Sequence, residues 1–312
     1  MGRSPLLSSD GLAMRMLTSP YLAVTLAMVF WAGSTVVVRG VREEVPPFGL
    51  SFWRTMLGAA LVLPFAWRPL VRQLELVRRH FWMLMLLSFL LIVAGNAVLF
   101  LALQYTLAIN VGVLNSFEPL LIIVVAWAIF RDPVTFNQLA GVLVSLLGVF
   151  ALIGRGDPRA ILELDFNAGD ILVLFAYVSW AFYAACLRLA PRELDPRAML
   201  FLILFMGAMQ LIPFYAIEWA VDRPMTFGLP AISAIVGLAV FSSAGAIFLW
   251  NYSIRHLGPA RAGFFIHLIV AFTVIMAIVF LGEVFAWFHG LGIALIGIGI
   301  YLSLYRGRGE RG

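Results

Sequence analysis

Apolar residues recur along the chain in runs long enough to cross a lipid bilayer, and short polar segments separate them. A membrane-spanning helix needs about 20 predominantly apolar residues. The segments between the runs are short, and the longest, residues 154–169, is too small for a catalytic domain. The pattern predicts an all-α integral membrane protein with ten transmembrane helices, whose function lies within the membrane. The predicted helices cover about residues 20–38, 48–67, 81–103, 108–130, 135–153, 170–188, 198–217, 229–252, 259–281 and 286–305.

The two halves of the chain share one register. Trp180 follows Trp31 by 149 positions, and the same ungapped spacing joins further residue pairs. Those pairs are Arg39 with Arg188, Pro47 with Pro196, Gly58 with Gly207, Pro64 with Pro213, Gly141 with Gly290 and Gly148 with Gly297. Each half holds five helices, so the second half must enter the membrane from the opposite side. The sequence therefore predicts a 5+5 inverted repeat, with residues 1–153 as the first repeat and 154–312 as the second.

Composition indicates that lipid surrounds most of the side chains. Hydrophobic residues make up 63% of the chain and charged residues 12%, whereas soluble domains average about 45–50% apolar and about 25% charged residues. The net charge of +5 does not indicate nucleic-acid binding, because the arginines lie between apolar runs rather than in a basic tail or stripe.

The distribution of arginine predicts the orientation. If both termini lie in the cytoplasm, most arginines fall on the inner side, and the outer side receives only Arg39, Arg42, Arg155, Arg159 and Arg223. An excess of basic residues in cytoplasmic loops is the usual rule for membrane proteins. We therefore expect both termini to be cytoplasmic, in a multi-pass protein of the cell inner (plasma) membrane.

Motifs of several enzyme and pump classes are missing from the sequence. It contains no HExxH motif, nucleophile elbow or Walker A motif, so we expect no metal site, no cofactor and no ATP-driven transport within this chain. Cys186 is the single cysteine and cannot form an internal disulfide. The first apolar run follows Arg15 and has no small-residue cleavage site, so it is expected to be a transmembrane helix rather than a signal peptide.

Several short motifs add a resemblance to this picture. The first half carries Phe30-Trp31-Ala32-Gly33-Ser34, Arg54 and the run Val111–Leu120, and the second half carries Leu281-Gly282-Glu283. With ten helices in two repeats, the whole chain resembles the drug/metabolite transporter superfamily, EamA type. Within it, the chain is most similar to the YddG-type aromatic amino-acid exporters, through Arg39–Glu43, Val111–Asn115, Trp180-Ala181-Phe182-Tyr183 and Trp250-Asn251. The resemblance implies export of aromatic amino acids.

The chain departs from the family pattern at two places. Val134 occupies the position that matches Glu283, and Leu268 stands where a proline is expected opposite Pro119. Any gating role tied to the missing residues is therefore in doubt in the half that lacks them.

Three charged or histidine residues lie well inside predicted helices, away from the helix ends, where such groups usually face a bundle interior or cavity: Arg54, Glu118 and His267. Glu118 and His267 are related by the 149-residue spacing, and Pro119 is expected to open the fourth helix beside Glu118. Helical spacing places Asn115 on the face of Glu118 and Phe264 on the face of His267. Glu118 and His267 are candidates for substrate contact or proton exchange, or else for buried packing. Arg54 is a candidate for binding a carboxylate or for a structural role.

Aromatic and polar residues complete the predicted cavity. Trp31 and Ser34 share one face of the first helix, and Tyr177 and Trp180 share one face of the sixth. The paired tryptophans are expected to line a cavity and stack on planar substrates. Asn96 is a further cavity candidate, although its small neighbours also suit close helix packing.

These features together predict a secondary transporter that exports small molecules by alternating access. The expected cargo is an amino acid, with a preference for aromatic side chains, and protons are a candidate coupling ion. One alternative keeps the fold and changes the cargo to a drug-like cation, another metabolite or a sugar derivative. A second alternative is an intramembrane enzyme acting on a lipid, with Glu118 and His267 as acid and base. The expected partners are the small-molecule substrate and the lipid bilayer, and no nucleic acid is expected.

Overall fold

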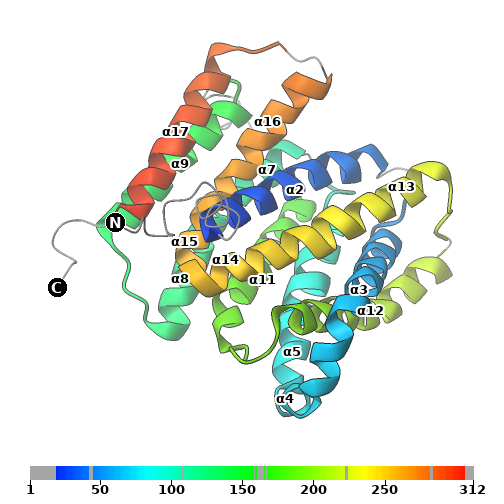
Figure 1. Ribbon diagram of the computed structural model, residues 1–312. Coiled ribbons are helices and arrows are strands. Elements are labelled where there is room, and N and C mark those ends of the chain that lie inside the picture. Colours follow the sequence, from blue (N-terminus) through cyan, green and yellow to red (C-terminus); the bar gives the residue numbers. More distant parts are fainter. Residues whose placement is uncertain are drawn as a thin grey trace, which may run out of the picture.

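The computed structural model describes residues 19–41, 45–106, 108–157, 159, 165, 167–221, 224–281 and 284–305. Both chain ends lie outside the described residues, so the cytoplasmic placement of the termini stays a prediction. Gly282 and Glu283 of the Leu281-Gly282-Glu283 motif also lie outside them. Within the described residues the protein is all-helical, with ten helices that are long and apolar enough to span a membrane (Figure 1). This confirms the predicted helix count and fold class.

The ten spans include several that are built from consecutive helical segments. The first two are α2 (Pro20–Val41) and α3 (Pro47–Arg72), and the short helix α4 (Leu74–Arg79) follows them. The remaining elements are α5 (Phe81–Ser88), η2 (Phe89–Ala97), α6 (Val98–Ala102), α7 (Ala108–Asn115), α8 (Glu118–Phe130), α9 (Phe136–Ile153), α11 (Ala168–Cys186), η3 (Leu187–Leu189), α12 (Pro196–Ala220), α13 (Leu229–Gly237), η4 (Leu238–Ala246), α14 (Ile247–Leu257), α15 (Pro259–Gly263), η5 (Phe264–Ile266), α16 (His267–Leu281) and α17 (Trp287–Leu304).

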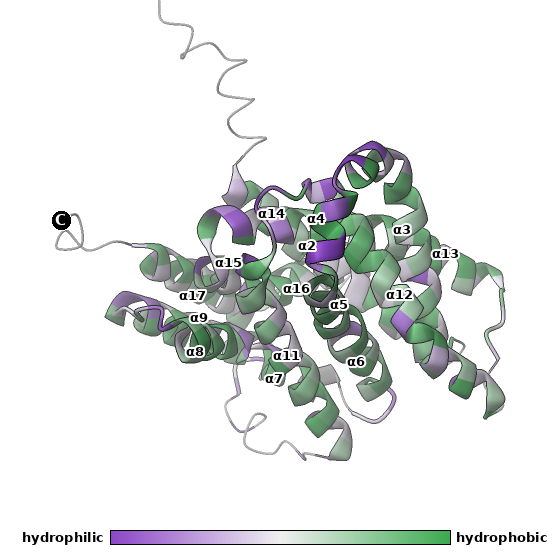
Figure 2. Cartoon of the chain, turned by 90° about the horizontal axis from the view of Figure 1, so that it is seen from below, coloured by the Kyte–Doolittle hydropathy of each residue, from purple (hydrophilic) through white to green (hydrophobic). Residues whose placement is uncertain are grey.

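The outer surface of the bundle is apolar. Large side chains such as Phe136 and Trp82 are 83% and 80% exposed, and hydrophobic residues cover most of each helix, while hydrophilic ones gather in connecting segments (Figure 2). A surface of this kind is stable against lipid and not against water. The structure therefore agrees with the bilayer as the surrounding solvent.

Departures from regular helix recur at the repeat spacing. The backbone widens to a π-helix in η2 and in η4, and both segments start and end 149 positions apart. The break between α7 and α8 at residues 116–117 likewise has its counterpart in η5, a tight 3₁₀ turn at Phe264–Ile266. Such irregular turns inside helices often mark functional positions. The register that the sequence displays is thus also a register of backbone geometry.

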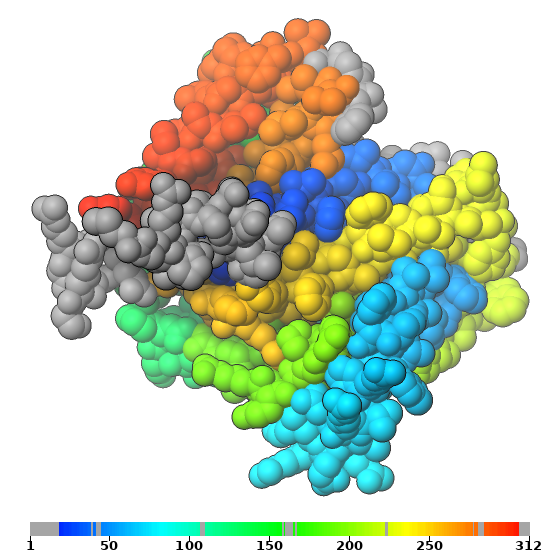
Figure 3. Space-filling model, viewed as in Figure 1, coloured from blue at the N-terminus to red at the C-terminus, as the bar shows by residue number. Residues whose placement is uncertain are grey.

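The packing of the helices also reflects the repeat between the two halves. The helix α3 packs against α12, and α9 packs against α17, so each pair joins corresponding helices of the two halves. The helix α2 packs against η4, α14 and α16, while α11 packs against η2, α6 and α8 (Figures 1 and 3). The first helix of each half therefore lies among the third and fourth helices of the other half.

Polar contacts join the two halves at one end of the bundle. The Gln73 side chain donates to the Glu193 carbonyl (2.7 Å) and accepts from the Asp195 backbone N–H (2.9 Å). The guanidinium of Arg188 donates to the Asp132 carboxylate (Nη1 to Oδ1, 3.0 Å). This hydrogen bond lowers the pKa of Asp132 below its ordinary value. The segments that precede α5, α9 and α12 are thereby tied together at this end.

The pair of α9 and α17 approaches closely through glycines, which gives a first prediction. A Cβ atom added at Gly141 would lie 2.1 Å from the Ser303 Oγ and 2.4 Å from the Gly299 carbonyl oxygen. Gly141→Ala should therefore lower stability by about 1–3 kcal/mol through overpacking, seen as a lower Tm in detergent. Gly297→Ala, in the same pair but with nothing within 4 Å of the added atom, is the control. An equal loss in both variants would contradict the packing argument.

Candidate functional site

A cavity of about 300 Å³ lies between the two halves, at the lower end of the size of small-molecule sites. Its lining comes from the C-terminal part of α2, the N-terminal part of α3 and the middle of α11, together with the third, fourth, fifth, eighth and ninth spans. Most of the lining is apolar or aromatic. The polar and aromatic lining residues are Trp31, Ser34, Thr35, Arg54, Asn96, Phe100, Asn115, Glu118, Tyr177, Trp180, Ser242 and Thr273.

Tryptophans from both repeats meet at the cavity. The rings of Trp31 and Trp180 lie edge to face, with centroids 4.9 Å apart, and Trp31 also contacts Trp250 at 5.5 Å. Trp250 is fully buried and does not line the cavity. The Nε1 of Trp180 has no hydrogen-bond partner. The two related tryptophans therefore present an aromatic wall to whatever occupies the cavity.

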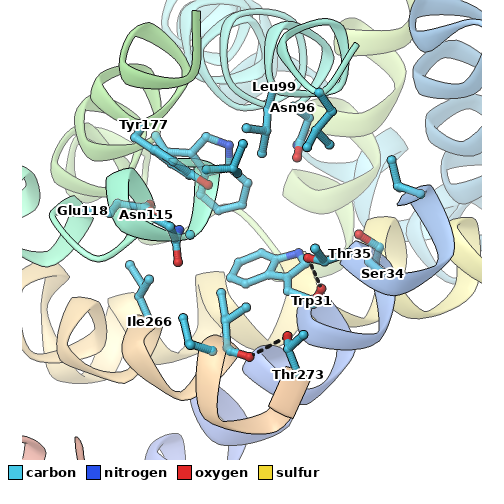
Figure 4. Close-up of a pocket in the computed structure, with 18 of the residues that line it drawn as sticks. Trp31, Ser34, Thr35, Asn96, Leu99, Asn115, Glu118, Tyr177, Ile266 and Thr273 are labelled. Atoms are coloured by element: carbon cyan, nitrogen blue, oxygen red, sulfur yellow. Dashed lines mark hydrogen bonds between the residues drawn. The ribbon is translucent and has the colours of Figure 1, made fainter. Parts of the chain in front are cut away.

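The break in the fourth span places a carboxyl group on the cavity. Because Pro119 has no backbone N–H and stands at the start of α8, the helix cannot continue regularly through this point. Asn115 ends α7 and donates from Nδ2 to the Glu118 Oε2 (3.1 Å), while the Glu118 Oε1 has no partner. Glu118, Asn115 and Tyr177 lie on one side of the cavity, opposite Ser34 and Thr35, with Trp31 between them (Figure 4).

A guanidinium group lines the same cavity from α3. Arg54 is 1% exposed, and its Nη1 donates to the hydroxyls of Ser242 and Ser243, at 3.4 Å each. Its Cζ lies 4.6 Å from the centre of the Phe100 ring. Its Nε and Nη2 have no hydrogen-bond partner among the described residues. The cavity thus holds one cationic group and one carboxyl group, each incompletely hydrogen-bonded by the protein.

Three other polar lining residues donate to carbonyls of their own helices. Ser34 donates to the Phe30 carbonyl (2.7 Å), Thr35 to the Trp31 carbonyl (3.1 Å), and Asn96 to the Leu91 carbonyl (2.9 Å). These bonds use the hydroxyl protons of Ser34 and Thr35 and one amide N–H of Asn96. Arg54 and Glu118 are the basic and acidic groups among the lining residues.

Two of the predicted site residues lie elsewhere. His267 is 1% exposed, and its Nε2 lies 2.8 Å from the Ser116 carbonyl, which fixes Nε2 as the protonated nitrogen. Phe264 packs with Ile123 and Val142. Neither residue lines the cavity. The ninth span presents Ile266, Ile269, Val270, Thr273 and Val274 to it instead, at the 3–4-residue spacing of one helix face.

The physical reason for this difference is that the cavity is not symmetric. Glu118 lines it, whereas its counterpart His267 is buried where its Nε2 meets the Ser116 carbonyl in the break of the fourth span. The remaining predicted residues, Trp31, Ser34, Asn96, Asn115, Tyr177, Trp180 and Arg54, do line the cavity with Glu118.

Sequence reasoning missed Thr35 and Phe100 as lining residues. Phe100 follows Asn96 by four positions, and helical spacing alone could have placed it on the face of that candidate. Thr35 adjoins Ser34, and no signal in the sequence distinguishes it. Asn251, part of the Trp250-Asn251 motif, accepts a hydrogen bond from the Tyr183 hydroxyl (2.7 Å) and lies outside the cavity.

Comparison with known proteins adds independent findings. The sequence model of the EamA-like transporter family matches residues 18–154 and 167–305. An uncharacterized transporter of Archaeoglobus fulgidus is 27% identical over 289 residues, covering 91% of this chain and 96% of that protein. The uncharacterized transporter YyaM of Bacillus subtilis is 25% identical, covering 81% and 83%. A solved crystal structure superposes with a TM-score of 0.75 at 17% identity, covering 91% of this chain and 96% of that one, which shows a shared fold.

Proposed function

Because the chain belongs to the EamA-like transporter family, we propose that it is a secondary transporter that exports amino acids and prefers those with aromatic side chains. That the protein is a multi-pass membrane transporter follows from the family and the helices. The cargo, the direction of transport, the plasma-membrane location and coupling to protons are parts of the proposal.

The observation that carries the proposal is the chemistry of the cavity. Its walls are apolar and include Trp31, Trp180 and Tyr177, and its incompletely bonded groups are the Arg54 guanidinium and the Glu118 carboxyl. An amino acid with an aromatic side chain offers a carboxylate, an ammonium group and a planar apolar ring. These three groups match the cavity without leaving a charge unpaired.

Alternating access is supported by the asymmetry between the two ends of the bundle. The cavity is lined by residues of the C-terminal part of α2 and the N-terminal part of α3, whereas the contacts of Gln73 and Asp132 join the halves at the opposite end of the bundle, beyond the C-terminal ends of α3 and α8. Two halves with the same backbone irregularities can exchange conformations, and the exchange would open this end and close the other.

Transport in proteoliposomes tests the proposal. The purified full-length chain is reconstituted, and the loss of labelled phenylalanine, a labelled nucleotide sugar and a labelled drug-like cation is followed. We expect phenylalanine to move faster than in empty vesicles and to be inhibited by tryptophan and tyrosine. Movement of the nucleotide sugar or of the cation alone would replace the proposed cargo, and movement of no amino acid would refute the proposal.

A further inference from the structure

The side chain of Arg54 is held in one orientation from two directions. The hydroxyls of Ser242 and Ser243 both lie 3.4 Å from Nη1, and Cζ lies over the Phe100 ring, 4.6 Å from its centre. A guanidinium over an aromatic ring at this distance is attracted by the ring face. Three residues from the third and eighth spans thus hold the guanidinium in position.

The edge that remains is the one formed by Nε and Nη2. Both nitrogens are buried, and neither has a hydrogen-bond partner in the part of the chain that the structure describes. Their N–H groups are parallel and spaced to bind the two oxygens of one carboxylate. We infer that the Nε–Nη2 edge of Arg54 is the subsite for the carboxylate of the cargo, an inference that rests on the proposed transport of amino acids.

A purely structural role does not account for this arrangement. No salt bridge to Arg54 occurs within the part of the chain that the structure describes. A buried cation without a counter-charge is strongly destabilising, and the protein offers Arg54 only two hydroxyls and a ring. A cargo carboxylate would supply both the missing charge and the two missing acceptors.

Arg54 and Glu118 line different parts of the cavity, so their roles can be tested separately. The helices α3 and α8 lie on opposite sides of the bundle (Figure 1), yet both residues line one cavity. Recognition of a carboxylate at Arg54 therefore makes a prediction independent of any role of Glu118. Removing the carboxylate from the ligand should matter as much as removing the guanidinium from the protein.

The test combines changes in the ligand with changes in the protein. Binding to the purified full-length chain is measured by competition against labelled phenylalanine, using phenylalanine, phenylalaninamide and phenethylamine. Direct binding of labelled hydrocinnamate, which keeps the carboxylate and lacks the amino group, is measured alongside. The protein variants are Arg54→Gln, Arg54→Lys and, as a control with the same loss of charge at an exposed residue outside the cavity, Arg78→Gln.

We expect the unaltered protein to bind phenylalanine at least about tenfold more tightly than its amide, the scale of a charge-assisted bidentate hydrogen bond. Arg54→Gln should weaken phenylalanine binding by a similar factor and leave the amide within about twofold, so that discrimination collapses. Arg54→Lys should keep part of the discrimination between phenylalanine and its amide, because lysine preserves the positive charge but lacks the two parallel N–H donors of the guanidinium. Arg78→Gln should retain full discrimination between phenylalanine and its amide.

Equal binding of phenylalanine and its amide by the unaltered protein would overturn the inference, and this comparison does not depend on whether the Arg54 variants fold. An equal loss for both ligands in Arg54→Gln would overturn it as well. If no amino acid is transported but hydrocinnamate binds in an Arg54-dependent way, the carboxylate subsite stands and the proposed amino-acid cargo fails. If neither phenylalanine nor hydrocinnamate binds, both fail.

Discussion

Replacing Glu118 by glutamine is expected to abolish the response of transport to an imposed pH gradient. Glu118 lines the cavity, and its Oε1 has no hydrogen-bond partner among the described residues, so we expect this carboxyl to bind and release the exchanged proton during the transport cycle. Glutamine keeps an oxygen for the hydrogen bond from Asn115 and cannot ionise. With one proton exchanged per cargo, a gradient of one pH unit supports about tenfold accumulation on the acidic side. The variant should show none, as measured by labelled phenylalanine in proteoliposomes.

Two further variants distinguish this role from general damage. Glu118→Asp keeps a titratable group and should retain the gradient response at a lower rate. His267→Gln cannot titrate either, yet its amide can still donate to the Ser116 carbonyl that His267 Nε2 contacts at 2.8 Å. We expect it to retain the response, because His267 does not line the cavity. Loss of the response in His267→Gln with its survival in Glu118→Gln would reverse the assignment.

The second large effect is expected at Gly95, in the π-helical segment of the third span. A Cβ atom added there would lie 2.4 Å from the Cδ1 and 2.5 Å from the Nε1 of Trp180. The indole would have to move, and its edge-to-face contact with Trp31 would be lost. Gly95→Ala should therefore cost about 1–3 kcal/mol of stability and lower phenylalanine transport by about tenfold or more, measured as Tm and initial rate.

The control for this substitution lies in the eighth span. Gly237→Ala adds the same atom where nothing lies within 4 Å, and it should preserve both Tm and transport. If Gly95→Ala transported phenylalanine at the normal rate, the position of the Trp180 ring would not be important for the cargo.

The sequence predicted the ten spans and the repeat of the fold, but not the two π-helical segments. Alternation of apolar runs and short polar gaps predicted ten spans, because the bilayer allows a helix few other lengths. The spacing of 149 positions that joins Trp31 and Trp180 also joins η2 with η4 and the break after Asn115 with η5. The two π-helical segments were not predicted, since local composition carries no distinct signal for a widened turn.

The sequence did not predict which residues of the two repeats line the cavity. The same spacing relates Glu118 to His267, and the sequence predicted that both residues line the cavity. The structure brings one to the cavity and buries the other against the Ser116 carbonyl. A repeat in sequence places two residues at the same depth in related helices, but the conformation of the bundle decides which of them meets an open space.

The sequence by itself determined the membrane environment, the number of spans, the register between the halves and the rarity of charge inside the bilayer. Each of these follows from hydrophobicity and spacing along the chain. Only the tertiary structure decided that Arg54 meets Ser242, Ser243 and Phe100 and keeps one edge free, since these residues come from three separate spans. Contacts between distant segments depend on how helices cross, and no local pattern encodes the angle or the depth of that crossing.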